Sequence, residues 1–193
     1  GVELTTFFSD DELKSFGMSD VQINDPNFIG VESSIESETF DYSFFGYTQE
    51  EASLMDPQIR LFHEQVWVAL EDAGCNPHDY LERIGIFVAA NDNLNWRVHA
   101  LTSQGSNVNP FYLNQISDKN YISTLISYKL NLKGPSYYID TACSSSLTAV
   151  HLACRNLLLR ECSVAIAGGI RINTLKERGY FYQEGMIFSK DGH

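Results

Sequence analysis

Residues 137–151 read YYIDTACSSSLTAVH, and this stretch decides the fold class. An apolar run stops at Asp140, one cysteine follows among small residues, and the chain from Ser144 onward has the pattern of a helix. A strand that turns tightly into a helix needs small side chains around the residue at the turn. The stretch therefore predicts a strand-to-helix elbow that presents the thiol of Cys143.

The segments around this elbow predict alternating strands and helices. Strands are expected at 84–90 (IGIFVAA), at 136–139 and at 163–167, where Gly168 and Gly169 end the last strand. Helices are expected at 119–130, which Gly134 and Pro135 follow, and from 144 to about 160. This order predicts an α/β fold with a mainly parallel sheet and helices on its faces.

A further helix is predicted to begin at Asp56 and Pro57. Asp56 can cap it, Pro57 suits its first position, and Gly74 suits its end. Apolar residues recur at helical spacing and are expected to form its buried face: Ile59, Phe62, Val66, Ala69, Leu70 and Ala73.

The remaining segments carry weaker signals. Ser9 and Glu12 form a capping-box pattern, which predicts a short helix. Residues 20–48 are interpreted as ordered loop with short turns, and the Asn-rich residues 91–116 as polar loop. We expect one partial domain over 1–193, with an acidic loop-rich lead at 1–56 and a β-α-β-α-β region with the elbow at 57–193.

Composition places limits on the class of protein. With 193 residues, 44% hydrophobic and 20% charged, the chain is typical of one soluble globular domain. No apolar run approaches the ~20 residues that span a bilayer, so no membrane association is expected. Neither a signal peptide nor an initiating Met opens the sequence, which favours a segment of a longer, cytoplasmic protein.

The formal charge of −12 lies entirely in residues 1–56, which hold thirteen acidic residues and one basic residue, Lys14. Residues 57–193 balance twelve acidic with twelve basic residues. Nucleic acid is disfavoured as a partner, because no basic stripe could neutralise phosphates. An acidic protein partner is expected to dock away from the first 56 residues.

Four cysteines lie far apart without a C-x-x-C pair, so neither a metal site nor a disulfide framework is predicted. Cys154 and Cys162 are expected as small core residues, and Cys75 follows the helix-ending Gly74. Cys143 differs because it precedes a helix, where free N–H groups and the helix dipole favour thiolate. Those N–H groups, that of Cys143 included, could stabilise an oxyanion in acyl transfer. A small buried cysteine beside helix-capping serines is the alternative.

A thiol nucleophile normally has a histidine beside it. The sequence places none of its five histidines there: His63, His78, His99, His151 and His193. His151 comes eight residues after Cys143, about 12 Å along a helix at about 1.5 Å per residue, too far for a direct hydrogen bond. The catalytic set is therefore predicted to be incomplete in this chain.

The motifs resemble those of β-ketoacyl synthases, especially the ketosynthase domains of modular polyketide synthases. DTACSSSL at 140–147 with HLAC at 151–154 is similar to the active-site elbow of that family. FDYSFFGYTQEEASLMDPQIRLFHEQVWVALEDAG at 40–74 is similar to the family's stretch before its next strand. IGIFVAA, ISYKLNLKGPSYYIDTACSSSL, VAIAGGI and FSKDGH follow in the family's order, so the resemblance covers nearly the whole chain.

The resemblance implies a thiolase-like fold, present as a partial N-terminal half, and a homodimer within a larger synthase. It implies decarboxylative Claisen condensation, in which Cys143 accepts an acyl chain from the phosphopantetheine thiol of an acyl carrier protein. The domain itself is expected to hold no cofactor or metal. Of the family's catalytic residues only Cys143 carries over, since its two histidines and second oxyanion amide would follow His193. We therefore expect no condensation by these 193 residues alone.

Some residues depart from the family pattern or are interpreted as structural. His63 stands where leucine is more common, which we interpret as a tolerated change on the helix. Asp56 and Arg60 are interpreted as a helix cap and a buried charge pair. The loop after the strand at 84–90 lacks the family's Gly-rich form, and is expected to shape the acyl tunnel or a dimer contact.

Two other functions are considered. A ketosynthase-like domain could bind or transacylate carrier cargo without condensing it. Domains that only set chain length usually lack the cysteine, so Cys143 disfavours that version. A cysteine hydrolase with an α/β-hydrolase elbow would need glycines that flank the nucleophile in a G-x-C-x-G pattern, and Ala142, Ser144 and Ser145 do not supply them.

Overall fold

A computed structural model describes residues 4–103, 107–173 and 178–193. The chain divides into two compact units, one of residues 1–36 with 173–193 and one of residues 37–172. Each unit is described by itself.

The larger unit is built on a three-stranded parallel sheet in the order β5-β4-β6. The strands are β4 (Ile84–Ala90), β5 (Ser136–Tyr138) and β6 (Val164–Ile170). The predicted strands and the parallel α/β arrangement are confirmed. β6 runs through Gly168 and Gly169 instead of ending there, because both glycines pair with β4.

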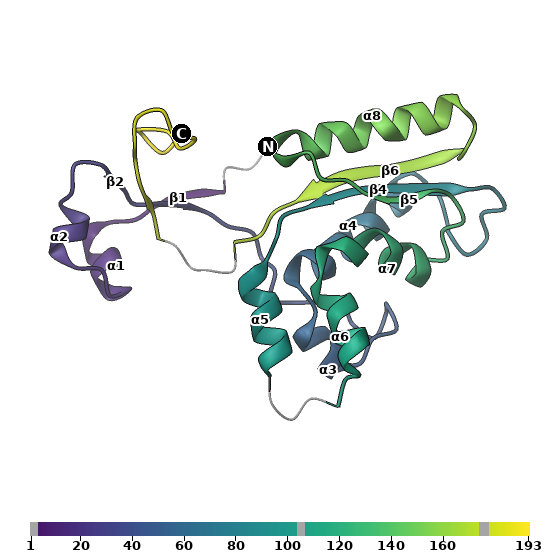
Figure 1. The fold of residues 1–193 in the computed structure, drawn as a ribbon, viewed down its shortest axis with the longest axis horizontal. Helices are drawn as coiled ribbons and strands as arrows, with labels where there is room; N and C mark the ends of the chain where they lie inside the picture. Colours follow the sequence, from purple (N-terminus) through teal and green to yellow (C-terminus); the bar gives the residue numbers. More distant parts are fainter. Residues whose placement is uncertain (1–3, 104–106, 174–177) are drawn as a thin grey trace. The chain divides into compact units, whose positions relative to one another are not determined.

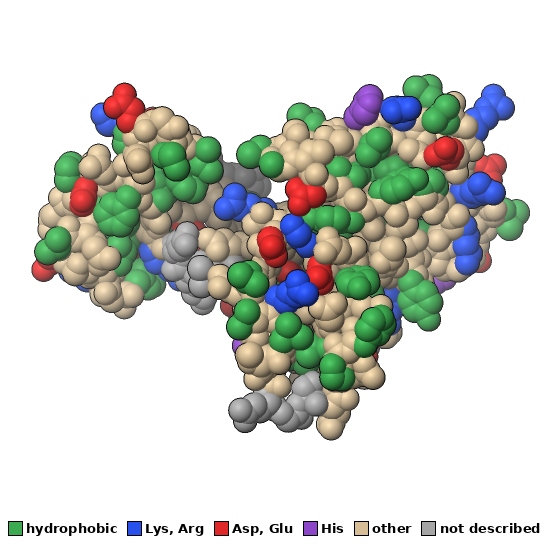
Figure 2. Space-filling view, viewed as in Figure 1, with side chains coloured by type: hydrophobic (Ala, Val, Ile, Leu, Met, Phe, Trp, Pro, Cys, Tyr) green, Lys and Arg blue, Asp and Glu red, His purple; other side chains and the backbone are tan. Residues whose placement is uncertain are grey.

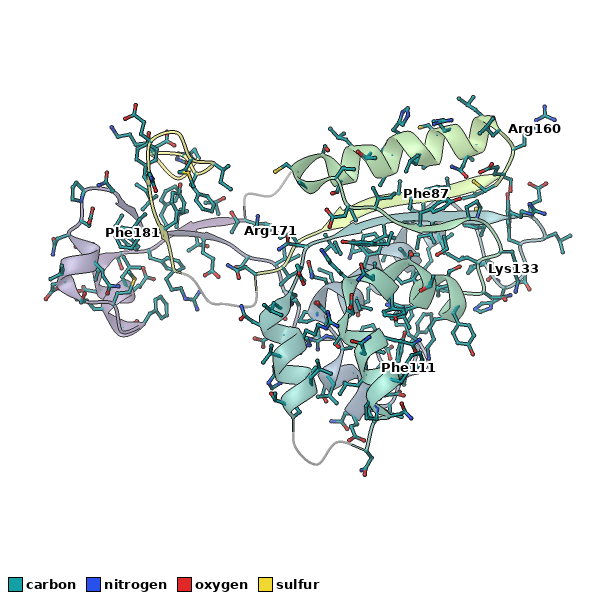
Figure 3. All side chains as sticks on the ribbon, in the orientation of Figure 1. Phe87, Phe111, Lys133, Arg160, Arg171 and Phe181 are labelled. Carbon is teal, nitrogen blue, oxygen red and sulfur yellow. The ribbon has the colours of Figure 1, made fainter. Side chains whose placement is uncertain are left out.

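Helices cover both faces of this sheet (Figure 1). α8 (Ser145–Leu158) packs on β6 and β4 from one side, whereas α4 (Pro57–Asp72) and α7 (Ile122–Lys129) contact the sheet from the other. Successive β4 side chains point to opposite faces. Ile86 and Val88 belong to the core on the α4 and α7 side, and Phe87 to a smaller core beneath α8 (Figure 3).

α4 begins and ends as predicted. The Asp56 carboxylate accepts the Gln58 N–H at 2.8 Å, Pro57 is the first helical residue, and Gly74 adopts a φ of +65° just beyond the helix. Ile59, Phe62, Val66 and Leu70 are buried as expected. Ala69 and Ala73 were wrongly predicted to be buried: both are exposed, because the core-facing stripe of α4 is narrower than the set of apolar residues.

The prediction of a polar loop over residues 91–116 was wrong. The segment contains α5 (Leu94–Thr102) and α6 (Pro110–Ser117), with residues 104–106 outside the described ranges. Asn109 caps α6 by accepting the Phe111 N–H at 2.9 Å, and Pro110 takes the first helical position. The asparagine that suggested a loop is thus a helix cap, which is one of the places where asparagine is favoured.

Three further elements complete the larger unit. α3 (Gln49–Leu54) is capped by Thr48 through a capping box, and η1 (Lys119–Tyr121) leads directly into α7. The helix predicted at 119–130 is therefore confirmed, with a 3-10 turn at its start. η2 (Ala142–Ser144) precedes α8 in the same way, which confirms the helix predicted from about 144.

The smaller unit consists of short paired strands and two short helices. β1 (Thr5–Phe7) pairs antiparallel with β3 (Val31–Ser33), and β2 (Phe28–Ile29) pairs with β7 (Tyr180–Phe181). The capping box predicted for α1 (Asp10–Ser15) is present. The loop predicted at 20–48 in fact contains α2 (Asp20–Ile23), β2 and β3. The partners of the two strands, β7 and β1, lie outside this segment.

Candidate functional site

The site is built where β5 turns into α8. After β5, the N–H of the buried Ile139 still donates to the Val88 carbonyl at 2.8 Å, so the chain stays bound to the sheet. Cys143 follows four residues later, inside η2, and α8 begins at Ser145. The predicted strand-to-helix elbow is therefore present, at the carboxyl end of a parallel strand where open α/β sheets place their ligands.

The elbow depends on small residues and on a strained turn. Ala142 has a φ of +53°, a region that costs an L-residue about 1–2 kcal/mol. The first turn of α8 lies so close to β6 that a Cβ on Gly169 would stand 2.9 Å from the Ser146 Cβ. Glycine in β6 and serine in α8 therefore let the helix start rest directly on the sheet.

Serine hydroxyls hold the turn together. Ser145 Oγ accepts the Thr141 N–H at 2.8 Å and donates to the Ala142 carbonyl at 2.7 Å. Ser144 Oγ donates to the Thr141 carbonyl at 2.8 Å. α8 itself has no side-chain cap, so these serines fix the elbow rather than cap the helix.

Cys143 is exposed at the tip of the elbow. Neighbouring amides are engaged, since Ala142 N–H donates to Asp140 and Ser144 N–H to the Thr141 carbonyl. Within the described part of the chain, neither the thiol nor the N–H of Cys143 makes a hydrogen bond. The first turn of α8 also carries no acidic residue. An open thiol and an open amide at a positive helix end suit a nucleophile and its oxyanion donor.

Two charged residues beside the elbow were not identified from the sequence. The Asp140 carboxylate accepts the Ala142 N–H at 3.2 Å, and its other oxygen lies 3.2 Å from the Lys119 Nζ. The Ala142 N–H and the Lys119 ammonium hold the pKa of Asp140 below its usual range. An aspartate two residues before a tight turn often bonds the backbone N–H there, which was the available signal. Lys119 is 21 residues away and gave none.

The other cysteines divide by their position on the fold. Cys162 is buried, as predicted, but Cys154 is exposed and its assignment to the core was wrong. Ala149 and Ala153 are among the α8 residues that are buried against the sheet, whereas Cys154 is exposed. Leu147, Val150 and Leu158 are exposed with Cys154, and hydrophobic side chains reach the surface along α8 in the space-filling view (Figure 2).

No histidine of the described chain is hydrogen-bonded to Cys143. His151 is exposed on α8, and the His193 ring packs 5.1 Å from that of Phe7 in the smaller unit. His63 is fully buried, with Nδ1 2.7 Å from the Ile59 carbonyl and Nε2 3.2 Å from the Tyr47 hydroxyl. His63 is thus a member of an aromatic core, in contact with the rings of Phe45 and Tyr47.

The interpretation of Asp56 and Arg60 as a buried charge pair is confirmed only in part: the two charges attract each other, but they are not in direct contact. Asp56 is buried, but it is held by Gln58 and by the Asn93 amide at 3.2 Å. Among the ion pairs of the described residues none joins Asp56 to Arg60 directly; Arg60 is partly buried and lies with its guanidinium 5.4 Å from the Trp96 ring centre. The direct contacts of the Asp56 carboxylate are therefore hydrogen bonds, and not the ion pair with Arg60 that the sequence predicted.

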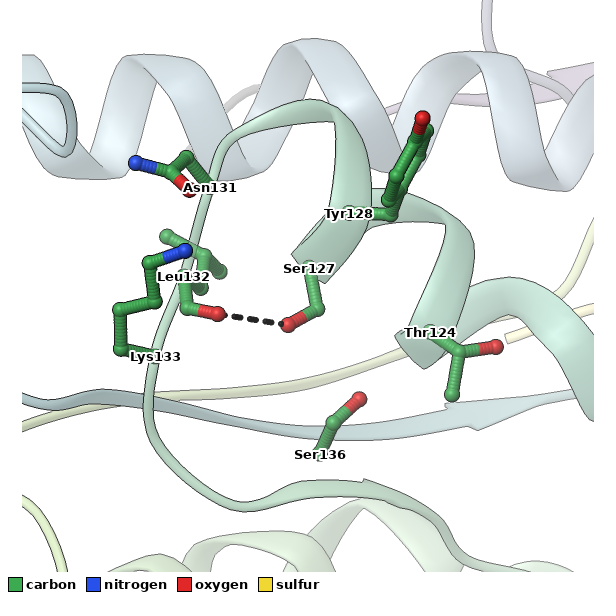
Figure 4. Close-up of a pocket in the computed structure, with 7 residues that line it drawn as sticks. All are labelled: Thr124, Ser127, Tyr128, Asn131, Leu132, Lys133 and Ser136. Atoms are coloured by element: carbon green, nitrogen blue, oxygen red, sulfur yellow. Dashed lines mark hydrogen bonds between the residues drawn. The ribbon is translucent and has the colours of Figure 1, made fainter.

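A cavity of about 360 Å³ lies at the opposite end of β5 (Figure 4). Its walls are Thr124, Ser127, Tyr128, Asn131, Leu132, Lys133 and Ser136. None of the residues that the sequence assigned to catalysis lines it, because Ser136 opens β5 and Cys143 follows its end.

Within the described ranges, no three metal-ligating side chains of His, Cys, Asp or Glu form a cluster. Those ranges also hold no helix with the length and apolar character needed to cross a membrane.

A thiol presented by a positive-φ turn at the end of a parallel strand marks the chain as an α/β protein with a strand-to-helix elbow. The profile of the β-ketoacyl synthase N-terminal domain matches residues 6–193, and the chain belongs to this family. The family resemblance noted in the motifs is thereby confirmed.

The relatives are large polyketide synthases. A phenolphthiocerol/phthiocerol polyketide synthase of Mycobacterium tuberculosis is 38% identical over all of this chain, which spans 14% of that protein. Polyketide synthase PksN of Bacillus subtilis is 35% identical over all of the chain, which spans 4% of it. The chain therefore corresponds to a small part of each of these relatives.

Solved ketosynthases share the fold. Ketosynthase twelve of the bacillaene polyketide synthase of Bacillus amyloliquefaciens superposes with a TM-score of 0.86 and 31% identity, covering 98% of this chain and 33% of that one. The module 1 ketosynthase of the bacillaene synthase from the same species gives 0.74 and 33%, covering 98% and 31%. The thiolase-like fold implied by the motifs is confirmed, and the chain spans about a third of each solved domain.

Proposed function

We propose that this chain is the acyl-accepting part of a ketosynthase domain that catalyses decarboxylative Claisen condensation in polyketide biosynthesis. The observation that carries the proposal is the elbow: an exposed Cys143, with thiol and amide both open, at the uncapped N-terminus of α8. Membership of the β-ketoacyl synthase family supports the same chemistry.

The first step would load the acyl chain. The Cys143 thiolate attacks the carbonyl carbon of a thioester on the phosphopantetheine arm of an acyl carrier protein, and the Cys143 N–H donates to the developing oxyanion. The bond to the carrier sulfur breaks, and the carrier sulfur leaves as a thiolate that takes up the proton lost earlier by the Cys143 thiol. In the second step an extender unit on a carrier loses CO₂ and its carbanion attacks the Cys143 thioester, which forms the C–C bond and releases the thiolate.

Condensation needs more than the described residues supply. No histidine of the described chain is bonded to Cys143, and the outward face of α8 carries exposed Leu147, Val150 and Leu158. We propose that the remainder of a ketosynthase domain covers this face and contributes the missing groups, since the chain spans about a third of the solved domains. Carrier protein, a second copy of the domain and the other domains of a synthase, in the cytoplasm, are the proposed partners.

The loading step can be tested in the full-length protein. It is incubated with an acyl chain on a carrier protein, and peptides are analysed by mass spectrometry. We expect an acyl mass increment on the Cys143 peptide, lost in Cys143→Ala. Cys154→Ala is the matched control, because Cys154 is also exposed on α8, and it should load normally. Loading that survives Cys143→Ala would refute the assignment.

A second measurement separates condensation from transacylation. The loaded protein is supplied with an extender unit on carrier protein, and carrier-bound products are identified by mass. A β-ketoacyl product is expected. Loading without product would instead establish the transacylating, non-elongating function.

A further inference from the structure

Lys119 and Asp140 form a charged pair that the acyl-transfer scheme does not use. Lys119 begins η1 and Asp140 follows β5, and their Nζ and Oδ2 atoms are 3.2 Å apart. Only about one-fifth of the Lys119 side chain is exposed, so the lysine end of the ion pair is partly buried. Tyr138 is the third member, since its hydroxyl lies 3.4 Å from Asp140 Oδ2 and its ring faces the Lys119 ammonium.

Asp140 acts on the backbone of the elbow. Its Oδ1 accepts the N–H of Ala142, the residue with a φ of +53° immediately before the nucleophile. A residue in this strained region keeps its conformation only when its surroundings hold it there. The carboxylate is one of those restraints, together with the Ser144 and Ser145 hydroxyls.

This restraint has an electrostatic cost. An unpaired carboxylate beside the elbow would repel a negatively charged sulfur there, because like charges repel. The Lys119 ammonium lies on the far oxygen of that carboxylate and offsets its charge. The same carboxylate can therefore hold the turn without opposing the negative sulfur.

We propose that Lys119 and Asp140 are positioning residues for Cys143: Asp140 holds the Ala142 turn, and Lys119 neutralises Asp140 so that the thiolate is not opposed. The proposal rests on the assignment of Cys143 as the nucleophile.

The thiolate is measured directly by alkylation. Full-length protein is treated with iodoacetamide at a series of pH values, and the rate at the Cys143 peptide is followed by mass spectrometry. Lys119→Met is expected to slow alkylation at neutral pH about two- to fivefold and to move the rate profile to higher pH, because the Asp140 charge is then no longer offset. Lys119→Arg keeps the charge and should restore the rate.

The double variant separates electrostatics from folding. Asp140→Asn removes the charge but keeps an oxygen for the Ala142 N–H, and by itself should move the profile to lower pH. Combined with Lys119→Met it should return the rate to near the parent value, since both charges are then absent. Lys133→Met, at the other end of β5, is the charge-matched control and should change nothing. Thermal midpoints show whether a variant is folded.

An unchanged profile in folded Lys119→Met, or a double variant as slow as Lys119→Met, would overturn the proposal. Acyl loading of the parent protein is measured in parallel. If the parent protein fails to load but Lys119→Met slows alkylation as expected, the acyl-acceptor function is refuted, while the effect of Lys119 and Asp140 on the reactivity of the Cys143 thiol is still established. Normal loading with no response to Lys119→Met would do the reverse.

Discussion

His63 is expected to make the larger unit sensitive to acid. Its side chain is fully buried between Ile59, Tyr47 and the Phe45 ring, whose centre lies 5.3 Å from that of the imidazole. Burial lowers the pKa of His63 to about 4. The hydrogen bond to the Ile59 carbonyl acts in the opposite direction and raises the pKa, whereas the nearby Lys129 ammonium lowers it further. The imidazole is therefore neutral in the folded protein at neutral pH.

The sign and size follow from linkage. In the unfolded chain the pKa of His63 is near 6.5, so between pH 6.5 and about 4 the unfolded state binds the proton more tightly. The contribution of the neutral His63 to the free energy of unfolding is fully present above pH 6.5, and it is lost as the pH falls from 6.5 to about 4. A difference of about 2.5 units, at about 1.36 kcal/mol each, removes about 3 kcal/mol from the free energy of unfolding.

The assay compares the parent protein with two variants that cannot titrate at this position. His63→Leu removes the ring, and His63→Gln keeps a polar group near the Tyr47 hydroxyl. Urea unfolding is followed by the fluorescence of Trp67 and Trp96, both in the larger unit. Either variant is expected to lose about 3 kcal/mol less than the parent between neutral pH and about pH 4. Equal losses in all three proteins would refute the reasoning.

Three further positions test the backbone and the helix ends of the larger unit. In Gly134→Ala, the new Cβ would lie 2.6 Å from the Ile84 carbonyl group, which is backbone and cannot move aside, so we expect a loss of about 1–3 kcal/mol. Gly74→Ala, where the Cβ meets open space at a φ of +65°, should cost only about 1–2 kcal/mol, and a larger loss there than at Gly134 would contradict this account. Asp56→Ala should cost about 1–2 kcal/mol in urea unfolding by removing the cap of α4, whereas Asp56→Asn, which keeps an acceptor, should retain most of that stability.

Much of the fold could be predicted because its signals are local. Asp56, Pro57 and Gly74 set the ends of α4, since a cap, a fixed φ and a positive φ act on adjacent residues. The alternation of apolar segments predicted the three parallel strands. Asn109 and Pro110 are also local signals, since they mark the start of α6, but the prediction of a loop over residues 91–116 did not use them. The short strands of the smaller unit had no such signal, because their partners are distant in the chain: β2 pairs with β7, and β1 pairs with β3 across the intervening α1, α2 and β2.

The sequence by itself determined the elbow and its thiol, because the small residues that a tight turn requires are neighbours of Cys143 in the chain. Only the tertiary structure decided what surrounds them. It brought Lys119 to Asp140, placed His63 in an aromatic core, and left Cys154 exposed. These outcomes depend on contacts between residues far apart in sequence and on which face of a helix meets the sheet. Neither is fixed by residue type or spacing alone, because the same periodic pattern allows several faces and partners.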